Sequence, residues 1–360
     1  MKLPIKVKPY KHQRIAFNFA LDKLKQEGCA ALLMDMGLGK SLTSIAIAGQ
    51  LYQENKIERV LVVCPTSIIS VWEKEFVKFA DYDYNVESIV GSTMSKRKEK
   101  LKTLCHKKGL KVAVINYEAT WRMEKELNVY KPDIIICDES QKIKNPSAAQ
   151  SKTLHRLGLK AKYKIILTGT PVQNSPMDVF SQWKFLDPNI FGVSFYAFRN
   201  RYAVMGGYYN HQIIRYKNMD EMTSKAHSVA YRITKEEALD LPEQIFLNRY
   251  CDLEKEARNV YDKVAKESYV ELMDGEITAT NVLTKLMRLS QIAGGHVKDD
   301  EGRMQVISKV KLNELKDIME DVIIDNKKKL VVFARFIPEI DSIIELAEEM
   351  GIQYSYITGS

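Results

Sequence analysis

The sequence predicts an α/β fold with a parallel sheet, because two hydrophobic patterns alternate along its first half. Four short β-branched runs are apolar on both faces, which is typical of strands buried inside a parallel sheet. Helical patterns lie between these runs, for example at residues 70–79 and 147–157. The alternation extends over about residues 28–190 and favours a doubly wound lobe. The four runs are residues 60–64, 112–115, 134–137 and 165–167.

The pattern changes after this first lobe. Aromatic residues crowd positions 191–209, and longer helical patterns follow at 253–273 and 278–292. This composition predicts a helical protrusion from about residue 190, without another sheet.

Strand signals return near the end of the sequence. Residues 330–334 and 354–357 are typical of strands, and residues 312–324 and 337–350 of helices. They predict the start of a second α/β lobe, and a lobe needs about 100–150 residues, so we expect this one to be truncated. The predicted domains are residues 1–230 (first lobe with protrusion), 231–305 (helical connecting segment) and 306–360 (start of the second lobe).

The overall composition is that of a globular protein with a substantial core, with 45% hydrophobic and 28% charged residues. No apolar run approaches the ~18 residues of a membrane span, and the first residues lack the apolar stretch of a signal peptide. The five cysteines show neither zinc nor disulfide spacing. We therefore expect a cytoplasmic monomer with no membrane partner and with buried thiols.

The formal net charge is +8, which permits a polyanionic partner without requiring one. The strongest local excess is residues 96–108, with seven Lys or Arg against one Glu. Two interpretations stay open for this segment. It is either the solvated face of a helix that turns Leu101 and Leu104 inward, or a surface that contacts phosphates.

A glycine-containing loop follows the apolar run at residues 30–34. Residues 36–41 read Met-Gly-Leu-Gly-Lys-Ser, and the two glycines let backbone amides approach phosphate oxygens. Lys40 would then reach the β- and γ-phosphates, and the Ser41 hydroxyl would bind Mg²⁺. The strict pattern has glycine where this chain has Met34. A glycine-rich turn with a surface lysine is therefore the alternative.

An acidic pair, Asp138 and Glu139, ends the apolar run at residues 134–137. Behind a phosphate-binding loop, Asp138 would hold Mg²⁺ and Glu139 would polarise the water that attacks the γ-phosphorus. The alternative is a pair of carboxylates that caps the next helix. The order of loop and acidic pair along the chain favours an ATP site.

Three other segments carry polar groups at a strand end or helix start. Residues 168–170 could bond both the acidic pair and a nucleic acid, or could form only a Gly-Thr-Pro turn. Residues 65–67 expose amides and hydroxyls that could bind a phosphate. Gln13 presents a donor and an acceptor, which suits an adenine edge.

These motifs together resemble the superfamily-two helicase-like ATPases, and within them the Swi/Snf-type DNA translocases, of a bacterial or phage kind. The fingerprint lies in residues 35–41, 138–145 and 167–174. Lys-Ile-Lys-Asn after the acidic pair and Val-Gln-Asn after Gly-Thr-Pro distinguish this family from RNA helicases. Further matches are residues 185–188, 231–235, 241–242, 283–289 and 331–336.

The resemblance implies two RecA-like lobes around one ATP and Mg²⁺, in a motor that moves along double-stranded DNA or displaces bound proteins. It implies catalytic roles for Lys40, Asp138, Glu139 and Gln141, with Ser41 and Asp138 as metal ligands. The implied nucleotide-binding residues are Gln13, Met36, Gly37, Leu38, Gly39, Lys40, Ser41 and Leu42. The implied nucleic-acid contacts are Pro65, Thr66, Ser67, Asn116, Tyr117, Lys144, Asn145, Thr168, Gly169 and Thr170.

The chain departs from the family pattern in three ways. Ser140 and Gln141 replace the Ala-His of the usual Asp-Glu-Ala-His motif, and Ser41 replaces a threonine. The family's last two motifs, with the arginines that complete the ATP site, would lie beyond residue 360. An arginine at the γ-phosphate contributes about 10³–10⁵ in rate in related enzymes. We therefore expect ATP binding with poor hydrolysis.

Two other classes of function stay open. One is a different superfamily-two enzyme, such as the motor subunit of a restriction system or an RNA helicase. The other is a DNA-binding module that uses ATP as a switch without turnover. A protein partner in replication, recombination or transcription is compatible with each of these functions.

Overall fold

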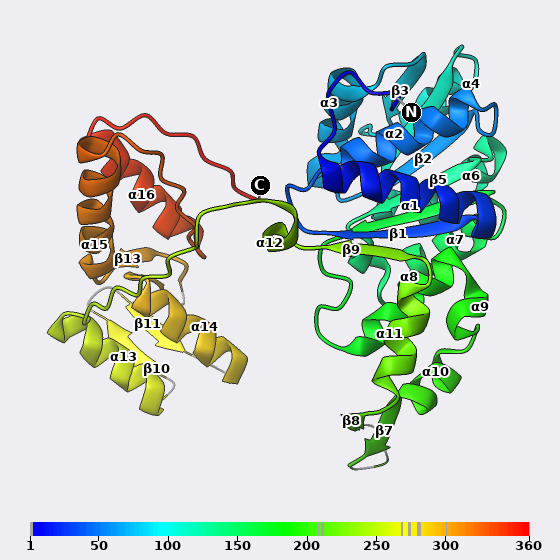
Figure 1. Cartoon of the computed structure of the whole chain (residues 1–360). Helices are drawn as coiled ribbons and strands as arrows, with labels where there is room; N and C mark the ends of the chain where they lie inside the picture. Colours follow the sequence, from blue (N-terminus) through cyan, green and yellow to red (C-terminus); the bar gives the residue numbers. More distant parts are fainter. Residues whose placement is uncertain are drawn as a thin grey trace. The chain divides into compact units, whose positions relative to one another are not determined.

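The chain folds into two compact units, Met1–Pro242 and Glu243–Ser360, which Figure 1 shows in colours that follow the sequence. Cys64 and Cys137 are buried as predicted. No helix in the described part of the chain is both long and apolar enough to cross a membrane. The computed structural model describes residues 3–207, 209, 212–267, 269–272, 275–278, 282–299 and 301–359.

The first unit is built on a seven-stranded sheet of order β3-β4-β2-β5-β6-β1-β9. All of its strand pairings are parallel, which confirms the predicted α/β fold. The four predicted runs form its central strands β2, β4, β5 and β6. The strands are β1 Cys29–Met34, β2 Arg59–Cys64, β3 Tyr84–Ser88, β4 Leu110–Asn116, β5 Ile134–Asp138, β6 Tyr163–Thr168 and β9 Ala230–Ile233.

Helices cover both faces of this sheet because alternate strand residues point to opposite sides. In β1, Ala30 and Leu32 pack in a core with α1, α2 and α3. Ala31 and Leu33 pack in a second core with α4 to α8 and α11. The helices are α1 Lys11–Glu27, α2 Lys40–Gln53, α3 Ile69–Phe79, α4 Met94–Cys105, α5 Tyr117–Arg122, α6 Glu124–Tyr130, α7 Ala149–Gly158 and α8 Val179–Leu186.

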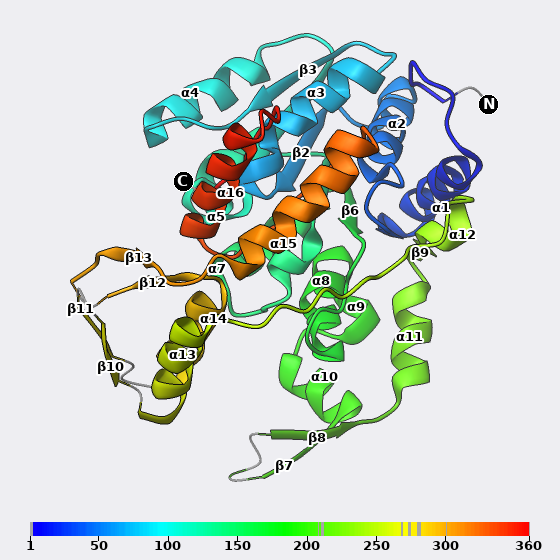
Figure 2. The same cartoon turned by 90° about the vertical axis from the view of Figure 1, so that its left-hand side faces the viewer.

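A protrusion follows α8, as predicted from about residue 190, and Figure 2 shows its helices below the sheet. Aromatic contacts hold it together, with ring centroids 5.1 Å apart for Phe180–Phe198 and 4.9 Å for Phe198–Tyr202. The expectation of helices alone was wrong, because β7 and β8 form an antiparallel hairpin. Its elements are α9 Pro188–Phe191, α10 Phe195–Tyr202, β7 Ala203–Gly206, β8 Gln212–Tyr216 and α11 Met219–His227.

The second unit combines helices with two small hairpins. The helical pattern predicted at residues 253–273 ends at Glu267, and part of this range lies outside the described residues. The next predicted helix, at residues 278–292, begins at Val282. Short β12 pairs with β13 before two further helices. The elements are α13 Lys255–Glu267, β10 Tyr269–Leu272, β11 Gly275–Thr278, α14 Val282–Ala293, β12 His296–Lys298, β13 Met304–Val306, α15 Val310–Met319, a π-helical turn Glu320–Asp325 and α16 Ile337–Glu349.

Two strands predicted for the second unit are not formed. Residues 330–334 and 354–357 lie in irregular structure and pair with no strand in the described residues. Phe333 is 93% exposed and Ile357 is 96% exposed. A strand exists only where a neighbour accepts its backbone hydrogen bonds, so the apolar pattern was insufficient here. The domain boundaries at residues 230 and 305 stay a prediction.

Candidate functional site

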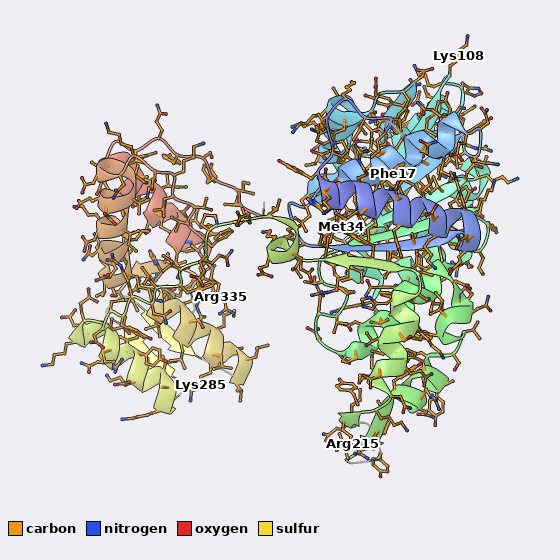
Figure 3. All side chains as sticks on the ribbon, in the orientation of Figure 1. Phe17, Met34, Lys108, Arg215, Lys285 and Arg335 are labelled. Atoms are coloured by element: carbon orange, nitrogen blue, oxygen red, sulfur yellow. The ribbon has the colours of Figure 1, made fainter. Side chains whose placement is uncertain are left out.

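The motifs singled out in the sequence lie along one edge of the seven-stranded sheet. Parallel strands have their carboxyl ends at the same edge, where ligands bind in open α/β sheets. The register places Thr168 at the end of β6 beside Leu33 of β1. It also places Asp138 at the end of β5 beside Leu167 of β6. Figure 3 labels Met34, which ends β1 at this edge.

The loop between β1 and α2 forms a turn that requires its glycines. Gly37 and Gly39 both have φ +85°, a backbone conformation that residues with a Cβ adopt at a cost. Gly39 is the N-cap of α2, and Lys40 is its first residue. The positive end of a 14-residue helix therefore opens directly behind the loop. This arrangement fits a bound phosphate.

Lys40 folds back over the end of β1. Its Nζ donates to the carbonyl of Met34 at 2.9 Å and lies 3.4 Å from that of Asp35. The Asp35 carboxylate in turn accepts from the backbone amide of Lys235 at 3.0 Å, just after β9. The loop is thus anchored near the ends of β1 and β9, and the Lys40 amine is held beside the glycine turn.

The start of α1 packs against the same loop. His12 Nε2 and Gln13 Nε2 both lie 3.1 Å from the carbonyl oxygen of Leu38. Gln13 Oε1 accepts from the Tyr10 amide at 3.0 Å. A Cβ on Gly39 would lie 2.3 Å from Gln13 Nε2, so glycine is needed for this approach. The Gln13 amide keeps one hydrogen and one lone pair for a further partner.

Asp138 is the buried carboxylate of the site, with 6% of its surface exposed. Its Oδ2 accepts from Trp72 Nε1 at 3.0 Å, and its Oδ1 accepts from the Glu139 amide at 3.0 Å. Tyr117 donates its hydroxyl to the Asp138 carbonyl at 2.7 Å. Burial raises the pKa of Asp138 to about 6, while the Trp72 hydrogen bond opposes this shift. Sequence reasoning did not find the Trp72 contact, because 66 residues separate the partners.

A chain of hydrogen bonds joins the acidic pair to the 168–170 segment. Gln141 donates through Nε2 to Glu139 Oε2 at 2.7 Å and accepts through Oε1 from the Thr168 hydroxyl at 2.9 Å. The Thr168 hydroxyl also accepts from the Thr170 amide at 3.0 Å. Glu139 itself adopts φ +51°, which turns the chain sharply after β5. The acidic pair and the 168–170 segment therefore belong to one hydrogen-bonded network.

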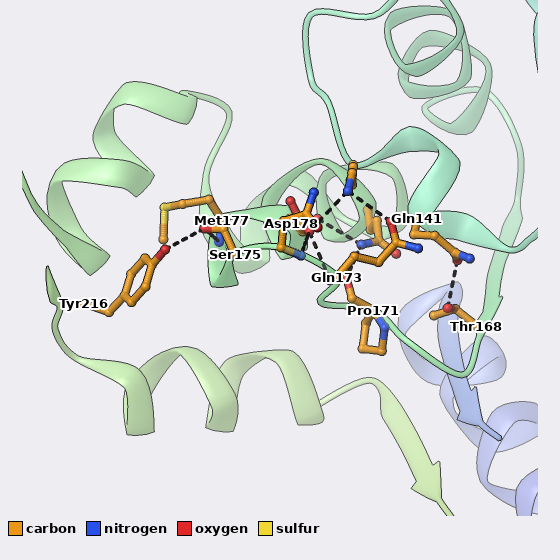
Figure 4. A network of polar contacts seen from close by, with 11 residues as sticks. Gln141, Thr168, Pro171, Gln173, Ser175, Met177, Asp178 and Tyr216 are labelled. Carbon is orange, nitrogen blue, oxygen red and sulfur yellow. Dashed lines mark hydrogen bonds and ion pairs between the residues drawn. The ribbon is translucent and has the colours of Figure 1, made fainter. Parts of the chain in front are cut away.

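This hydrogen-bonded network continues into the loop after Thr170, which Figure 4 shows from close by. Lys144 donates to Gln173 Oε1 at 3.0 Å and lies 3.7 Å from the Asp178 carboxylate. Asp178 also accepts from the Gln173 amide at 3.1 Å. Ser175 and Tyr216 of β8 are 2.9 Å apart through their hydroxyls. The loop is thereby tied both to the segment after the acidic pair and to the protrusion.

The residues implied as nucleic-acid contacts lie in three environments. Thr66, Ser67, Asn145 and Thr170 are exposed, whereas Pro65, Asn116, Lys144 and Gly169 are half-buried. Asn116 Nδ2 donates to the Thr66 hydroxyl at 3.2 Å, which brings two of them together. The side chains of Tyr117 and Thr168 are buried. Tyr117 instead supports the backbone of Asp138, because the start of α5 turns its ring into the core.

Residues 96–105 of the basic segment lie in α4, which turns Leu101 and Leu104 into the core. Lys98 lies 2.6 Å from Glu126, and Lys100 lies 3.0 Å from Glu87. These ion pairs support the interpretation of a solvated helix face for this part of the segment.

The oxygen donors at the sheet edge fit magnesium. The Ser41 hydroxyl lies in the first turn of α2, and the Asp138 carboxylate ends β5. Mg²⁺ is usually bound through one or two protein oxygens together with substrate phosphates. A buried carboxylate beside the glycine loop would meet that requirement if the loop held the phosphates of a nucleotide.

Comparison with known proteins places these features in a family. Residues 12–295 match the sequence model of the SNF2-related domain. The DNA repair and recombination protein RDH54 of Saccharomyces cerevisiae is 24% identical over 92% of this chain and 40% of its own length. The putative ATP-dependent helicase/translocase YwqA of Bacillus subtilis is 26% identical over 98% of this chain and 38% of its own.

A solved structure agrees with the sequence comparison. The SWI2/SNF2 ATPase core of Sulfolobus solfataricus in complex with double-stranded DNA superposes with a TM-score of 0.57 at 26% identity. The match covers 97% of this chain and 71% of that one. The chain spans about 40% of the length of the curated relatives RDH54 and YwqA.

Proposed function

Because the chain belongs to the family of SNF2-related domains, we propose that it is part of an ATP-driven motor that moves along double-stranded DNA. In this proposal the first unit binds ATP and one flank of the DNA. Movement along the duplex or displacement of bound proteins would be the output of the whole motor.

One observation carries the proposal. The phosphate-binding loop, the acidic pair and the 168–170 segment lie at one sheet edge, and Gln141 joins the last two by hydrogen bonds of 2.7 and 2.9 Å. A signal at the γ-phosphate would therefore reach the DNA-facing turn through two side chains. A simple glycine-rich turn would not need this arrangement.

The nucleotide would lie against the start of α2. Backbone amides of residues 37–42 would hold the phosphates, and Lys40 would leave the carbonyl of Met34 to neutralise phosphate charge. Gln13 would contribute its remaining hydrogen and lone pair to the adenine edge. Met36 is exposed at 68% and would cover the bound nucleotide.

Hydrolysis would use the acidic pair. Glu139 would accept a hydrogen bond from the attacking water, and Gln141 would hold that carboxylate in place. When bound by Ser41 and Asp138, magnesium would neutralise the charge that develops on the β- and γ-phosphates. Trp72 and the Glu139 amide would fix both oxygens of Asp138 in the orientation that this role requires.

DNA would be held mainly through its phosphates. Thr66, Ser67, Asn116, Lys144 and Thr170 present hydroxyls, an amide and an amine at the same sheet edge. Contacts of this kind position a duplex without reading its sequence. The affinity should fall steeply with salt, with a slope of log K against log salt of about −0.9 per neutralised phosphate.

Binding experiments on this chain test the proposal. Fluorescent ATP with Mg²⁺ should bind, and Lys40→Ala should weaken that binding by at least about tenfold through loss of a charge-assisted contact. Lys23→Ala is the matched control, since Lys23 lies near the other end of α1 from Gln13 and pairs with Glu27 at 2.7 Å. Equal affinity of wild type and Lys40→Ala would overturn the assignment of the loop.

The choice of nucleic acid is tested by competition. A short labelled DNA duplex should bind more tightly than single-stranded DNA or duplex RNA, and Thr66→Ala should weaken it without changing nucleotide affinity. A preference for RNA would instead favour an RNA helicase. The slow hydrolysis expected of this chain stays a prediction, which phosphate release with and without duplex measures, with Lys40→Ala as background.

A further inference from the structure

A buried glutamine on α8 connects the two sides of the proposed site. The side chain of Gln182 has no exposed surface. Its Oε1 accepts from the Ser140 hydroxyl at 2.7 Å. Its Nε2 donates to the Pro171 carbonyl at 2.7 Å and to the Asp178 carbonyl at 2.9 Å. Figure 4 shows this region, with Pro171 and Asp178 labelled.

The partners of Gln182 belong to different functional segments. Ser140 lies between Glu139 and Gln141, on the side where the γ-phosphate would be. Pro171 directly follows Thr170, on the side proposed to contact DNA. Gln182 therefore holds both segments against one rigid helix, and it does so independently of the bond between Gln141 and Thr168.

We propose that Gln182 is a positioning residue that couples nucleotide binding to DNA binding. This inference rests on the proposed function, because it assigns the route by which the two ligands of that site influence each other. Displacement of Ser140 by nucleotide moves the Gln182 amide, and the same amide holds Pro171. The two segments therefore shift together.

The burial of these groups favours joint movement of the two segments. Ser140 and Gln182 are both fully buried, so neither can exchange its hydrogen bond for one to water. Breaking one bond leaves an unpaired polar group in the core, which disfavours any state in which the two segments move separately. Ser140 is also a departure from the Asp-Glu-Ala-His motif, and alanine could not make this contact.

The experiment measures how nucleotide changes DNA affinity. Anisotropy of a fluorescein-labelled DNA duplex gives its Kd with and without ATP and Mg²⁺, and the ratio of the two values is the coupling factor. Such factors commonly lie between about 5 and 150. Gln182→Met keeps the length of the side chain but removes its donor and acceptor. It should lower the coupling factor by about 2- to 30-fold.

Two further variants separate the Ser140 bond of Gln182 from its bond to Pro171. Ser140→Ala removes only the bond on the nucleotide side and should lower the coupling factor by less. The Ser140→Ala and Gln182→Met double variant should lose no more coupling than Gln182→Met alone, because both changes interrupt the same path. Additive losses would overturn the inference. If Gln182→Met does not fold, Ser140→Ala alone tests the inference, and an unchanged coupling factor in that variant overturns the inference.

Ser181→Ala is the matched structural control. Ser181 is fully buried on the same helix, and its hydroxyl lies 3.3 Å from His155 Nε2 of α7, away from both segments. It should lower stability without lowering the coupling factor, and an equal loss of coupling would overturn the inference. A wild-type factor of one would overturn it too, with the proposed function intact. Failure of the wild type to bind ATP or duplex would instead overturn the proposed function.

Discussion

The two compact units contain similar apolar runs but use them in opposite ways. Residues 60–64 of the first unit form β2, which is paired on both sides by β4 and β5. Residues 330–334 of the second unit are as rich in β-branched and aromatic residues. They pair with no strand in the described residues and leave Phe333 exposed.

The difference shows that strand formation depends on partners as well as on composition. In the first unit, each run has a neighbour that satisfies its amides and a helix layer that covers its side chains. The second unit offers helices α15 and α16 around a small core of Met319, Leu346 and Ala347. In the described residues neither of its hairpins, β10–β11 or β12–β13, pairs with residues 330–334 or 354–357. Three measurements test this contrast.

Hydrogen exchange should show the largest difference. Amides of β2 lie in the middle of the sheet and should open only with global unfolding, which for a domain costs about 5–15 kcal/mol. Amides of residues 330–334 should exchange at nearly free-chain rates. Mass spectrometry of peptides covering the two segments measures both. Slow exchange in residues 330–334 would show that this segment has acquired a strand partner.

A matched pair of phenylalanine substitutions should show the next largest difference. Phe17 lies on α1 and is 2% exposed in the core between that helix and the sheet, and Figure 3 labels it on the helix. Phe17→Ala should cost about 3–5 kcal/mol, because it removes buried surface and leaves a cavity. Phe333→Ala should stay within about 0.5 kcal/mol, since its ring is 93% exposed.

Tryptophan fluorescence during urea unfolding measures this pair. All three tryptophans, Trp72, Trp121 and Trp183, lie in the first unit, so the signal reports that unit alone. Circular dichroism follows both units and supplies the value for Phe333→Ala. A loss of more than about 1 kcal/mol in that variant would contradict the exposed placement of the ring.

Much of the first unit could be predicted from the sequence because its signals are local. A buried parallel strand is a continuous apolar run, and the loop at residues 36–41 has a fixed spacing of glycines and lysine. The edge strands β3 and β9 were missed, since each is short and only partly buried and so lacks a continuous run. Pattern alone cannot identify strands of this kind.

The network around the site could not be predicted, because its partners are distant in sequence. Trp72 and Asp138 are 66 residues apart, and Ser140 and Gln182 are 42 residues apart. Each contact depends on the order of strands in the sheet, which brings α3 and α8 beside β5. The sequence predicted a metal-binding role for Asp138 but not the indole that orients its carboxylate.

Asp138 is a buried carboxyl group at the site edge, so its protonation makes the stability of the first unit depend on pH. Burial raises the pKa of Asp138 from 3.8 to about 6. Between these two values the folded chain binds more protons than the unfolded chain, so this group makes stability fall as pH rises. The loss is complete about one pH unit above the folded value of about 6, and under the proposed function it is the cost of keeping a carboxylate available for magnesium.

Asp138→Asn should remove that cost and produce the smallest of the three effects. Its stability relative to wild type should rise between pH 4.5 and pH 7.5 by about 1–2 kcal/mol. The full effect of the pKa shift is not seen in this interval, because pH 4.5 already lies above the unfolded value of 3.8 and part of the loss has occurred there. Urea unfolding at the two pH values measures this difference, and Asp133→Asn is the control at the opposite end of β5. In the same variant, the magnesium-dependent part of nucleotide binding should vanish. A relative stability that is the same at both pH values would show that the Asp138 carboxylate is solvated.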